Sequence, residues 1–181
     1  VDVLFNTFAK SMAGIGAFVC GDKYLIDFFR YNMRSQQFAK SLPMPMVIGA
    51  LKRLELIETH PEYRERLWTI TRALQQGFRD KGFDIGGTLS TPVYMKGGVN
   101  EATNLVYDLR ERFNLFCSVV TYPVIPKGEI ILRIIPTAVH TLEDVEYTLN
   151  CFEACREKLL KGEYQKEMPR VADKYFEEQA K

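Results

Sequence analysis

The sequence lacks the features that mark membrane-spanning and nucleic-acid-binding proteins. No apolar run approaches the ~18 residues that a membrane-spanning helix needs. Basic and acidic residues are nearly balanced, at 24 and 23, which leaves a formal net charge of +1. Nucleic-acid-binding domains usually carry a clear basic excess. We therefore expect no transmembrane segment and no nucleic-acid partner.

Cysteine and histidine are scarce and do not cluster. The four cysteines are Cys20, Cys117, Cys151 and Cys155, and the two histidines lie elsewhere in the sequence. Cys151 and Cys155 are one helical turn apart, but no Cys-x-x-Cys pair accompanies them, so the sequence predicts no metal site. Free thiols are typical of a reducing compartment, and we expect a cytoplasmic protein.

Hydrophobic residues make up 46% of the 181 residues, which is enough for a packed core in one or two small domains. Short apolar runs predict strands, and apolar residues spaced three or four apart predict helices. Strands are expected at residues 1–8, 17–20, 92–95, 115–121 and 129–135. Helices are expected at residues 22–33, 43–57, 61–81, 99–113 and from 142 onward. This alternation favours an α/β fold.

Capping signals mark two of these helix starts. Thr59 followed by Glu62 predicts a capping box for the third helix, in which proline is tolerated in the first turn. Thr141 followed by Asp144 predicts a cap for the last helix, whose apolar stripe should bury Leu142.

The stretch around Lys10 is the most informative part of the sequence. Apolar residues at 3–5 and 17–20 flank a segment that contains Lys10, Gly14 and Gly16, which predicts a strand, a sharp turn and a second strand. A lysine held on such a stiff turn can be desolvated. Desolvation favours the neutral amine, which can attack a carbonyl carbon.

This stretch begins a series of motifs in a fixed order along the chain. Residues 7–10 read Thr-Phe-Ala-Lys, residues 37–43 read Gln-Phe-Ala-Lys-Ser-Leu-Pro, residues 122–128 read Tyr-Pro-Val-Ile-Pro-Lys-Gly, and residues 131–141 read Ile-Leu-Arg-Ile-Ile-Pro-Thr-Ala-Val-His-Thr. Together they resemble the motifs of the α-oxoamine synthase family, whose members use pyridoxal 5′-phosphate (PLP) to join an amino acid to an acyl-CoA. The resemblance covers nearly the whole chain except about the last twenty residues.

The resemblance implies a fold and a domain organisation. It implies the α/β aminotransferase-like architecture called fold type I, with this chain as the C-terminal half of a longer enzyme. Residues 1–58 would complete the large PLP-binding domain. Residues 59–181 would form the small C-terminal domain, with a polar tail from about residue 162. The family builds its sites at a two-fold interface, so a homodimer is also implied.

The same resemblance assigns roles to four residues. Lys10 would be the Schiff-base partner of PLP and would act as an acid or base on the substrate α-carbon. The hydroxyls of Thr7 and Ser41 would bind the cofactor phosphate, although strand neighbours could satisfy Thr7, and Ser41 could instead cap the following helix. Arg133 would bind the substrate carboxylate through two hydrogen bonds, and the alternative is a buried salt bridge to a protein carboxylate.

The activity implied by the resemblance is that of a PLP-dependent acyltransferase. It would condense serine or glycine with an acyl-CoA, in the manner of serine palmitoyltransferase. Glycine C-acetyltransferase is an alternative within the family, because residues 122–128 fit that branch as well. A non-catalytic companion subunit of the same fold is disfavoured because Lys10 is present. Since the chain would carry only half of a PLP site, we expect it to be inactive on its own.

Overall fold

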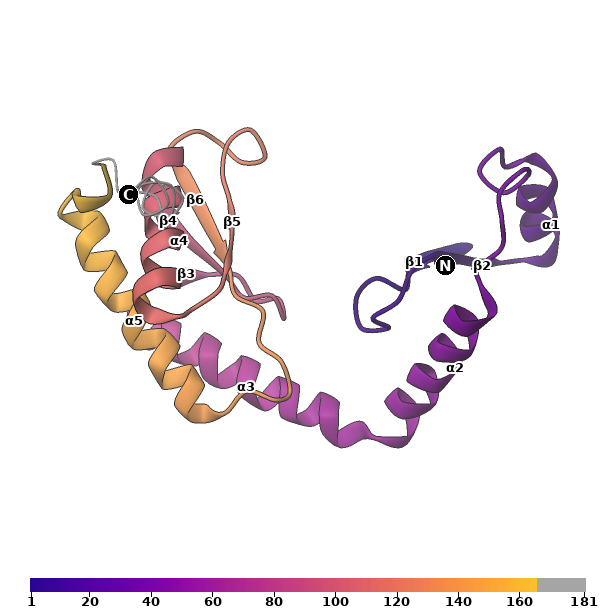
Figure 1. Ribbon diagram of the computed structural model, residues 1–181, viewed down its shortest axis with the longest axis horizontal. Coiled ribbons are helices and arrows are strands. Elements are labelled where there is room, and N and C mark those ends of the chain that lie inside the picture. Colours follow the sequence, from indigo (N-terminus) through magenta and orange to yellow (C-terminus); the bar gives the residue numbers. More distant parts are fainter. Residues whose placement is uncertain (166–181) are drawn as a thin grey trace, which may run out of the picture. The chain divides into compact units, whose positions relative to one another are not determined.

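A computed structural model of the chain describes residues 1–165, and the rest of the predicted polar tail lies outside the described residues. Contacts divide the chain into two compact units between Glu62 and Tyr63, and each unit is described by itself (Figure 1). The first unit contains β1 (Val3–Thr7), β2 (Ala17–Gly21), α1 (Lys23–Asn32) and α2 (Met44–Thr59). Helix α3 (Pro61–Asp80) begins at the boundary.

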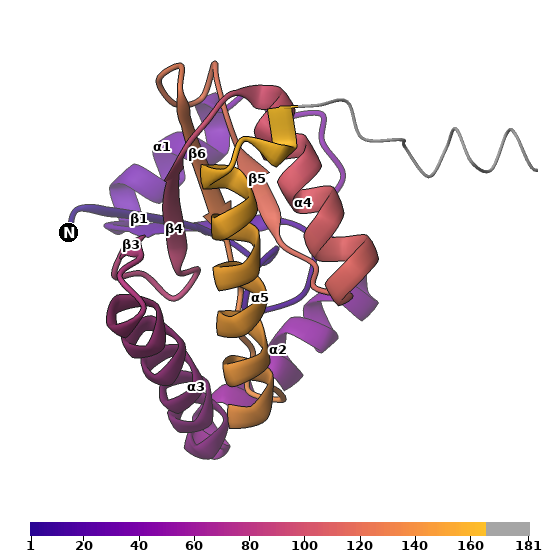
Figure 2. The same cartoon turned by 90° about the vertical axis from the view of Figure 1, so that its left-hand side faces the viewer.

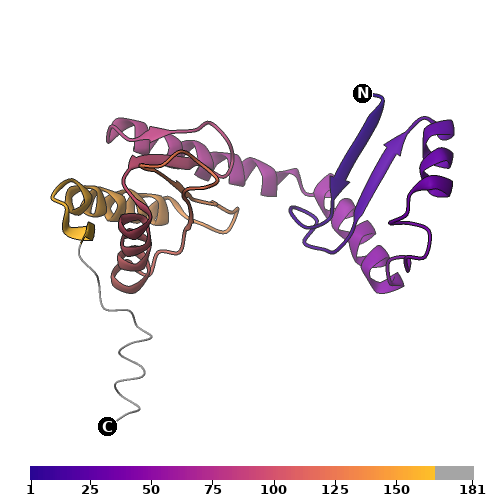
Figure 3. The ribbon, with the colours of Figure 1, turned by 90° about the horizontal axis from the view of Figure 1, so that it is seen from above.

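The first unit is an antiparallel hairpin followed by two helices. Strands β1 and β2 lie side by side (Figure 3). Their antiparallel register sets Val3 opposite Gly21 and Thr7 opposite Ala17. None of its residues is fully buried, and apolar side chains such as Phe28 and Leu51 are exposed. An isolated two-stranded hairpin is marginally stable in water. This unit therefore has no core of its own and depends on further contacts to bury its apolar surface.

The second unit is a four-stranded antiparallel sheet covered by helices. Its strands are β3 (Asp84–Ile85), β4 (Pro92–Lys96), β5 (Ser118–Val120) and β6 (Glu129–Arg133), in the spatial order β3-β4-β6-β5. The helices that follow α3 are α4 (Val99–Phe113), α5 (Leu142–Leu160) and the short 3₁₀ helix η1 (Glu163–Gln165). Figure 2 shows α5 in front of the sheet, with α3 and α4 on either side of it.

The core of the second unit lies between the sheet and these helices. Alternate residues of the central strands face this core, and Val93, Ile130 and Leu132 are fully buried, because successive strand side chains point to opposite faces. The buried apolar residues are Ile70, Leu74, Phe78, Phe83, Val93, Ala102, Leu105, Leu109, Cys117, Ile130, Leu132, Ile134, Val145, Leu149, Cys151, Phe152, Cys155 and Tyr164. The remaining strand positions, which include Arg133, therefore lie on the face that the helices leave open.

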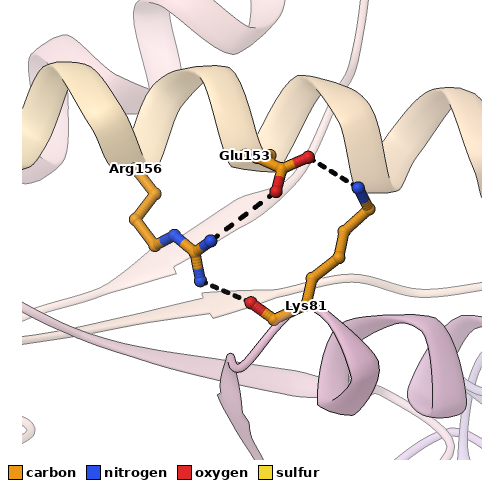
Figure 4. Close-up of polar contacts among 3 residues, drawn as sticks. All are labelled: Lys81, Glu153 and Arg156. Carbon is orange, nitrogen blue, oxygen red and sulfur yellow. Dashed lines mark hydrogen bonds and ion pairs between the residues drawn. The ribbon is translucent and has the colours of Figure 1, made fainter.

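A polar cluster joins the end of α3 to α5 (Figure 4). Glu153 accepts a hydrogen bond from Lys81, with 2.6 Å between Nζ and Oε2, and this bond lowers the pKa of the Glu153 carboxyl group. Arg156 lies 3.8 Å from the other carboxylate oxygen, donates to the Lys81 carbonyl at 2.7 Å and stacks over the Phe83 ring. These contacts hold the C-terminal end of α3 against α5.

The α/β fold and all of the predicted helices and strands are confirmed within a few residues. The capping box predicted at Thr59 is wrong, because Thr59 ends α2 and its hydroxyl donates to the Glu55 carbonyl. The predicted burial of Leu142 is also wrong, since this first residue of α5 is exposed. The cap at Thr141 is confirmed, with reciprocal bonds to Asp144.

Candidate active site

The loop that carries Lys10 joins β1 to β2 and is closed by its own backbone. The Phe8 amide donates to the Gly16 carbonyl at 2.9 Å, and the Gly14 amide donates back to the Phe8 carbonyl at 2.7 Å. A third bond, from the Ala13 amide to the Lys10 carbonyl, is 2.8 Å long. Gly16 has φ +104°, a conformation that residues with a Cβ rarely adopt. The loop therefore holds Lys10 on a defined support.

The side chain of Lys10 is exposed. Within residues 1–165, its ammonium group makes no ion pair and no side-chain hydrogen bond. The expectation that the turn itself desolvates this lysine is therefore not met by the described residues, because the first unit has no buried positions. Among the described residues, its Nζ atom therefore has no competing partner.

Thr7 is the last residue of β1 and lies opposite Ala17 in the hairpin. Its side chain is half-buried, and only its backbone amide has a side-chain partner, the Asn6 carboxamide oxygen at 2.8 Å. The Thr7 hydroxyl makes no hydrogen bond among the residues that the structure describes. Within residues 1–165, no strand neighbour satisfies this hydroxyl, against the alternative expected from the sequence.

Ser41 lies in the segment that precedes α2. The neighbouring Leu42 packs against the Lys10 loop, since a Cβ atom built on Gly16 would lie 2.8 Å from Leu42 Cδ2. The structure thus brings the Ser41 segment against the loop that carries Lys10. The alternative in which Ser41 caps α2 is wrong, because Pro43 occupies the N-cap position and no side chain caps the helix.

Arg133 belongs to the second unit, where it is the last residue of β6. Its side chain is exposed on the open face of the sheet, and its Nε atom donates to Ser118 Oγ at 3.2 Å. No carboxylate of residues 1–165 forms an ion pair with its guanidinium group. The predicted alternative, a buried salt bridge, is therefore wrong, and both Nη atoms are available to an external anion.

Ser118 is the residue at this site that sequence analysis missed. It has no motif of its own, and its place opposite Arg133 follows from the register between β5 and β6. Nothing in the local pattern encodes that register, so no signal in a single sequence identifies the contact.

The second unit also contains a groove of about 570 Å³ between α3, α5 and the segments after α4 and β6. The lining residues are Ile70, Leu74, Phe113, Asn114, Leu115, Phe116, Ile134, Ile135, Pro136, His140, Asp144, Val145, Tyr147 and Thr148. His140 is engaged within its own turn, where its Nδ1 atom accepts from the Thr137 amide at 2.9 Å. Among residues 1–165, no group of histidine, cysteine or acidic side chains is arranged to hold a metal ion. None of the helices described is long and apolar enough to cross a membrane.

Comparisons with known proteins match almost the whole chain. The family model for aminotransferase class I and II matches residues 1–152. A cysteate-C-fatty acyltransferase of Capnocytophaga ochracea is 57% identical over 166 residues, which are 91% of this chain and 40% of the relative. A serine palmitoyltransferase of Sphingobacterium spiritivorum is 34% identical over 148 residues, 81% of this chain and 37% of the relative.

The fold also matches solved structures. A high-resolution structure of SPT with a PLP internal aldimine has a TM-score of 0.77 and 28% sequence identity, over 86% of this chain and 39% of the other. The chain thus spans about two fifths of the length of these relatives. The family resemblance and the aminotransferase-like fold expected from the sequence motifs are confirmed. The chain belongs to the aminotransferase class I and II family, within its α-oxoamine synthase branch.

Proposed function

We propose that the protein containing this chain is a PLP-dependent acyltransferase that condenses an α-amino acid with an acyl-CoA. The observation that carries the proposal is Lys10, fixed on a closed loop three residues after Thr7, because neither side chain has a hydrogen-bond partner among residues 1–165. The family supports the cofactor, since PLP is bound in a solved SPT structure of the same fold.

The side chains around the loop fit PLP. The cofactor needs an amine for covalent attachment, and Lys10 Nζ has no competing partner among the described residues. Its phosphate needs hydrogen-bond donors, and the hydroxyls of Thr7 and Ser41 meet that need from two segments that pack together. When bound, PLP supplies an electron sink that allows bonds at the substrate α-carbon to break.

The residues of this chain would attach the cofactor, transfer the proton and bind the substrate carboxylate. Lys10 Nζ would hold the cofactor and then move a proton to or from the substrate α-carbon. Arg133 would bind and orient the substrate carboxylate through its two Nη atoms, because a guanidinium matches a carboxylate through two parallel hydrogen bonds. The roles of Lys10, Thr7, Ser41 and Arg133 are all part of this proposal.

The amino acid is the finer part of the proposal. The relative at 57% identity is a cysteate-C-fatty acyltransferase, which makes cysteate the first substrate to test. Serine is the next, because the relative at 34% identity is a serine palmitoyltransferase. Glycine, expected from the sequence motifs, completes the panel, and each amino acid is tested with short and long acyl-CoAs.

The homodimer and the cytoplasmic location also stay proposals. Light scattering of the purified protein tests whether it is a dimer.

Trapping of the lysine tests the cofactor assignment. The full-length protein is mixed with PLP, its visible absorbance is recorded, and borohydride reduction is followed by peptide mapping. We expect visible absorbance and a label on Lys10. Lys10→Ala should lose both. Lys40→Ala is the matched control, since Lys40 is an exposed lysine of the same unit, and it should keep both. A colourless protein, or a label on another residue, would contradict the proposal.

The same trapping separates the inactive alternatives. If the chain of residues 1–181 takes up no label while the full-length protein does, the half-site expectation is correct. If the full-length protein is labelled but turns over no amino acid with any acyl-CoA of the panel, the proposed substrates are wrong.

A further inference from the structure

We propose that Ser118 is a positioning residue that sets the direction from which Arg133 receives the substrate carboxylate. The inference rests on the proposed function, and it adds a residue that no motif marks. Its starting point is the hydrogen bond from Arg133 Nε to Ser118 Oγ, at 3.2 Å.

The sheet register makes this contact specific. Arg133 lies directly opposite Ser118 of β5 and, on its other side, opposite Pro92 of β4. Side chains that lie opposite each other in antiparallel strands project from the same face and interact. Proline offers no polar side-chain atom, so Ser118 supplies the only polar group of the two cross-strand neighbours.

The contact lies on the open face of the sheet. The adjacent residues Val93 and Leu132 are fully buried and face the helices, and strand side chains alternate between the faces. Arg133 is therefore presented to the outside of the second unit, and no carboxylate of residues 1–165 neutralises it. Its positive charge is available to an anion that approaches this face.

The hydrogen bond leaves one edge of the guanidinium group for that anion. A guanidinium can grip a carboxylate either through Nε and one Nη atom or through its two Nη atoms. Because Nε–H is already donated to Ser118, the carboxylate must bind end-on, to Nη1 and Nη2. The hydroxyl thus selects one of two binding geometries.

The same bond also prepares the side chain for binding. A long exposed arginine loses rotamer entropy when a ligand fixes it, and that loss weakens binding. An acceptor for Nε in the free protein limits the rotamers that Arg133 samples. Ser118 therefore acts on the amino acid through Arg133, without contact of its own.

Two substitutions by residues that are isosteric with each other test this role in the full-length protein loaded with PLP. Ser118→Thr keeps the hydroxyl and Ser118→Val removes it, and both residues suit a β-strand. Equilibrium binding of L-cysteate and L-serine is measured by calorimetry, beside KM and kcat for whichever amino acid turns over. We expect Ser118→Val to raise the amino-acid Kd and KM about tenfold, with kcat nearly unchanged, because a charge-assisted hydrogen bond is lost. Ser118→Thr should bind like the wild type.

A double-substitution cycle tests whether Ser118 affects amino-acid binding through Arg133. Lysine has no atom equivalent to Nε, so in an Arg133→Lys background the Ser118→Val change should have no further effect on binding. Ethanolamine, which has no anionic group for Arg133 to bind, should bind equally to the wild type and to Ser118→Val.

The outcomes separate this inference from the proposed function. If Ser118→Val binds both amino acids like the wild type while Arg133→Ala binds them weakly, the positioning role is overturned and the proposed function stands. An effect of Ser118→Val that persists in Arg133→Lys also overturns it, since Ser118 would then contact the substrate directly. If Arg133→Ala itself leaves binding unchanged, the assignment of Arg133 fails and this inference fails with it.

Discussion

Lys158 and Asp108 form an ion pair in the second unit, with 2.6 Å between Nζ and Oδ2. The Asp108 side chain is only 7% exposed, and the Lys158 side chain is 24% exposed. The Tyr164 hydroxyl donates to the same carboxylate oxygen at 2.8 Å. Burial of Tyr164 raises the pKa of its hydroxyl, so this donor keeps its proton. The pair thus joins α4, α5 and η1 through one buried carboxylate.

We expect Asp108→Asn to destabilise the protein by about 2–3 kcal/mol, because the partly buried ammonium of Lys158 loses its counter-charge. Urea denaturation of the full-length protein measures the change in the free energy of unfolding. The exposed pair Lys96–Glu129, whose side chains are 83% and 42% exposed, provides the control. Lys96→Met should cost less than about 0.5 kcal/mol, since exposed ion pairs contribute little. Equal losses in the two variants would contradict the importance of burial.

The lowered pKa of Glu153 predicts that the protein loses stability in acid. The hydrogen bond from Lys81 lowers the pKa of the Glu153 carboxyl from the ordinary value of 4.5. A lowered pKa in the folded state means that the unfolded chain takes up this proton first as the pH falls. The stabilisation is therefore complete above pH 4.5 and is lost as the pH falls through the lower folded-state pKa.

Thermal unfolding followed from neutral pH into this acid range measures the effect. Glu153→Gln should be less stable than the wild type at neutral pH, and the difference should shrink as the pH falls. Glu157→Gln is a control on the same helix, because Glu157 is exposed and forms no ion pair among residues 1–165. A difference between Glu153→Gln and the wild type that stays constant with pH would exclude this origin.

Local patterns predicted the secondary structure well. Ile70, Leu74 and Phe78 recur at intervals of four residues within the helix expected at residues 61–81, and these three residues do lie in the core. The cap at Thr141 was also predictable, because its hydrogen-bond partner, Asp144, lies within one turn of helix. Such features depend on residues that are close in sequence.

Features that depend on distant residues were not predictable from the sequence. The pairing of Ser118 with Arg133 joins residues from two strands, and only the register of the sheet brings them together. The environment of Lys10 is a second case. The motif identifies the residue, but burial depends on what packs around the loop, and the first unit provides no buried position. Thr59 failed as a cap because α2 continues to that residue.

The raised pKa of the Cys117 thiol predicts that the protein loses stability in alkali. Burial, with a smaller effect of the nearby Cys155, raises the pKa of the Cys117 thiol from 9.0 to about 12. Above pH 9.0 the unfolded chain loses this proton while the folded protein keeps it. Stability should therefore fall as the pH rises above that value, by up to about 1.4 kcal/mol per pH unit for this group. Denaturation at several alkaline pH values should show a smaller slope for Cys117→Ala. The exposed Cys20 provides the control, and Cys20→Ala should keep the wild-type slope.

Gly16 links the geometry of the Lys10 loop to cofactor binding. At its φ of +104°, alanine is strained, and the added Cβ would lie 2.8 Å from Leu42 Cδ2. Strain of this kind costs about 1–3 kcal/mol, so we expect Gly16→Ala to weaken PLP binding about tenfold or more. Titration of the full-length apoprotein with PLP, followed by absorbance, measures the Kd. Gly87→Ala is the matched control, because a Cβ there meets no atom within 4 Å, and it should bind PLP like the wild type.

A second substitution separates the two causes at Gly16. Leu42→Ala removes the atoms that the new Cβ would meet but leaves the backbone conformation unchanged. In the Gly16→Ala background it should therefore restore PLP affinity only in part, because the strain at positive φ persists. Full recovery would mean that the contact with Leu42 alone requires glycine at this position. No loss of affinity in Gly16→Ala at all would mean that the loop beside Lys10 tolerates a changed backbone, against the fixed support that the proposed cofactor site requires.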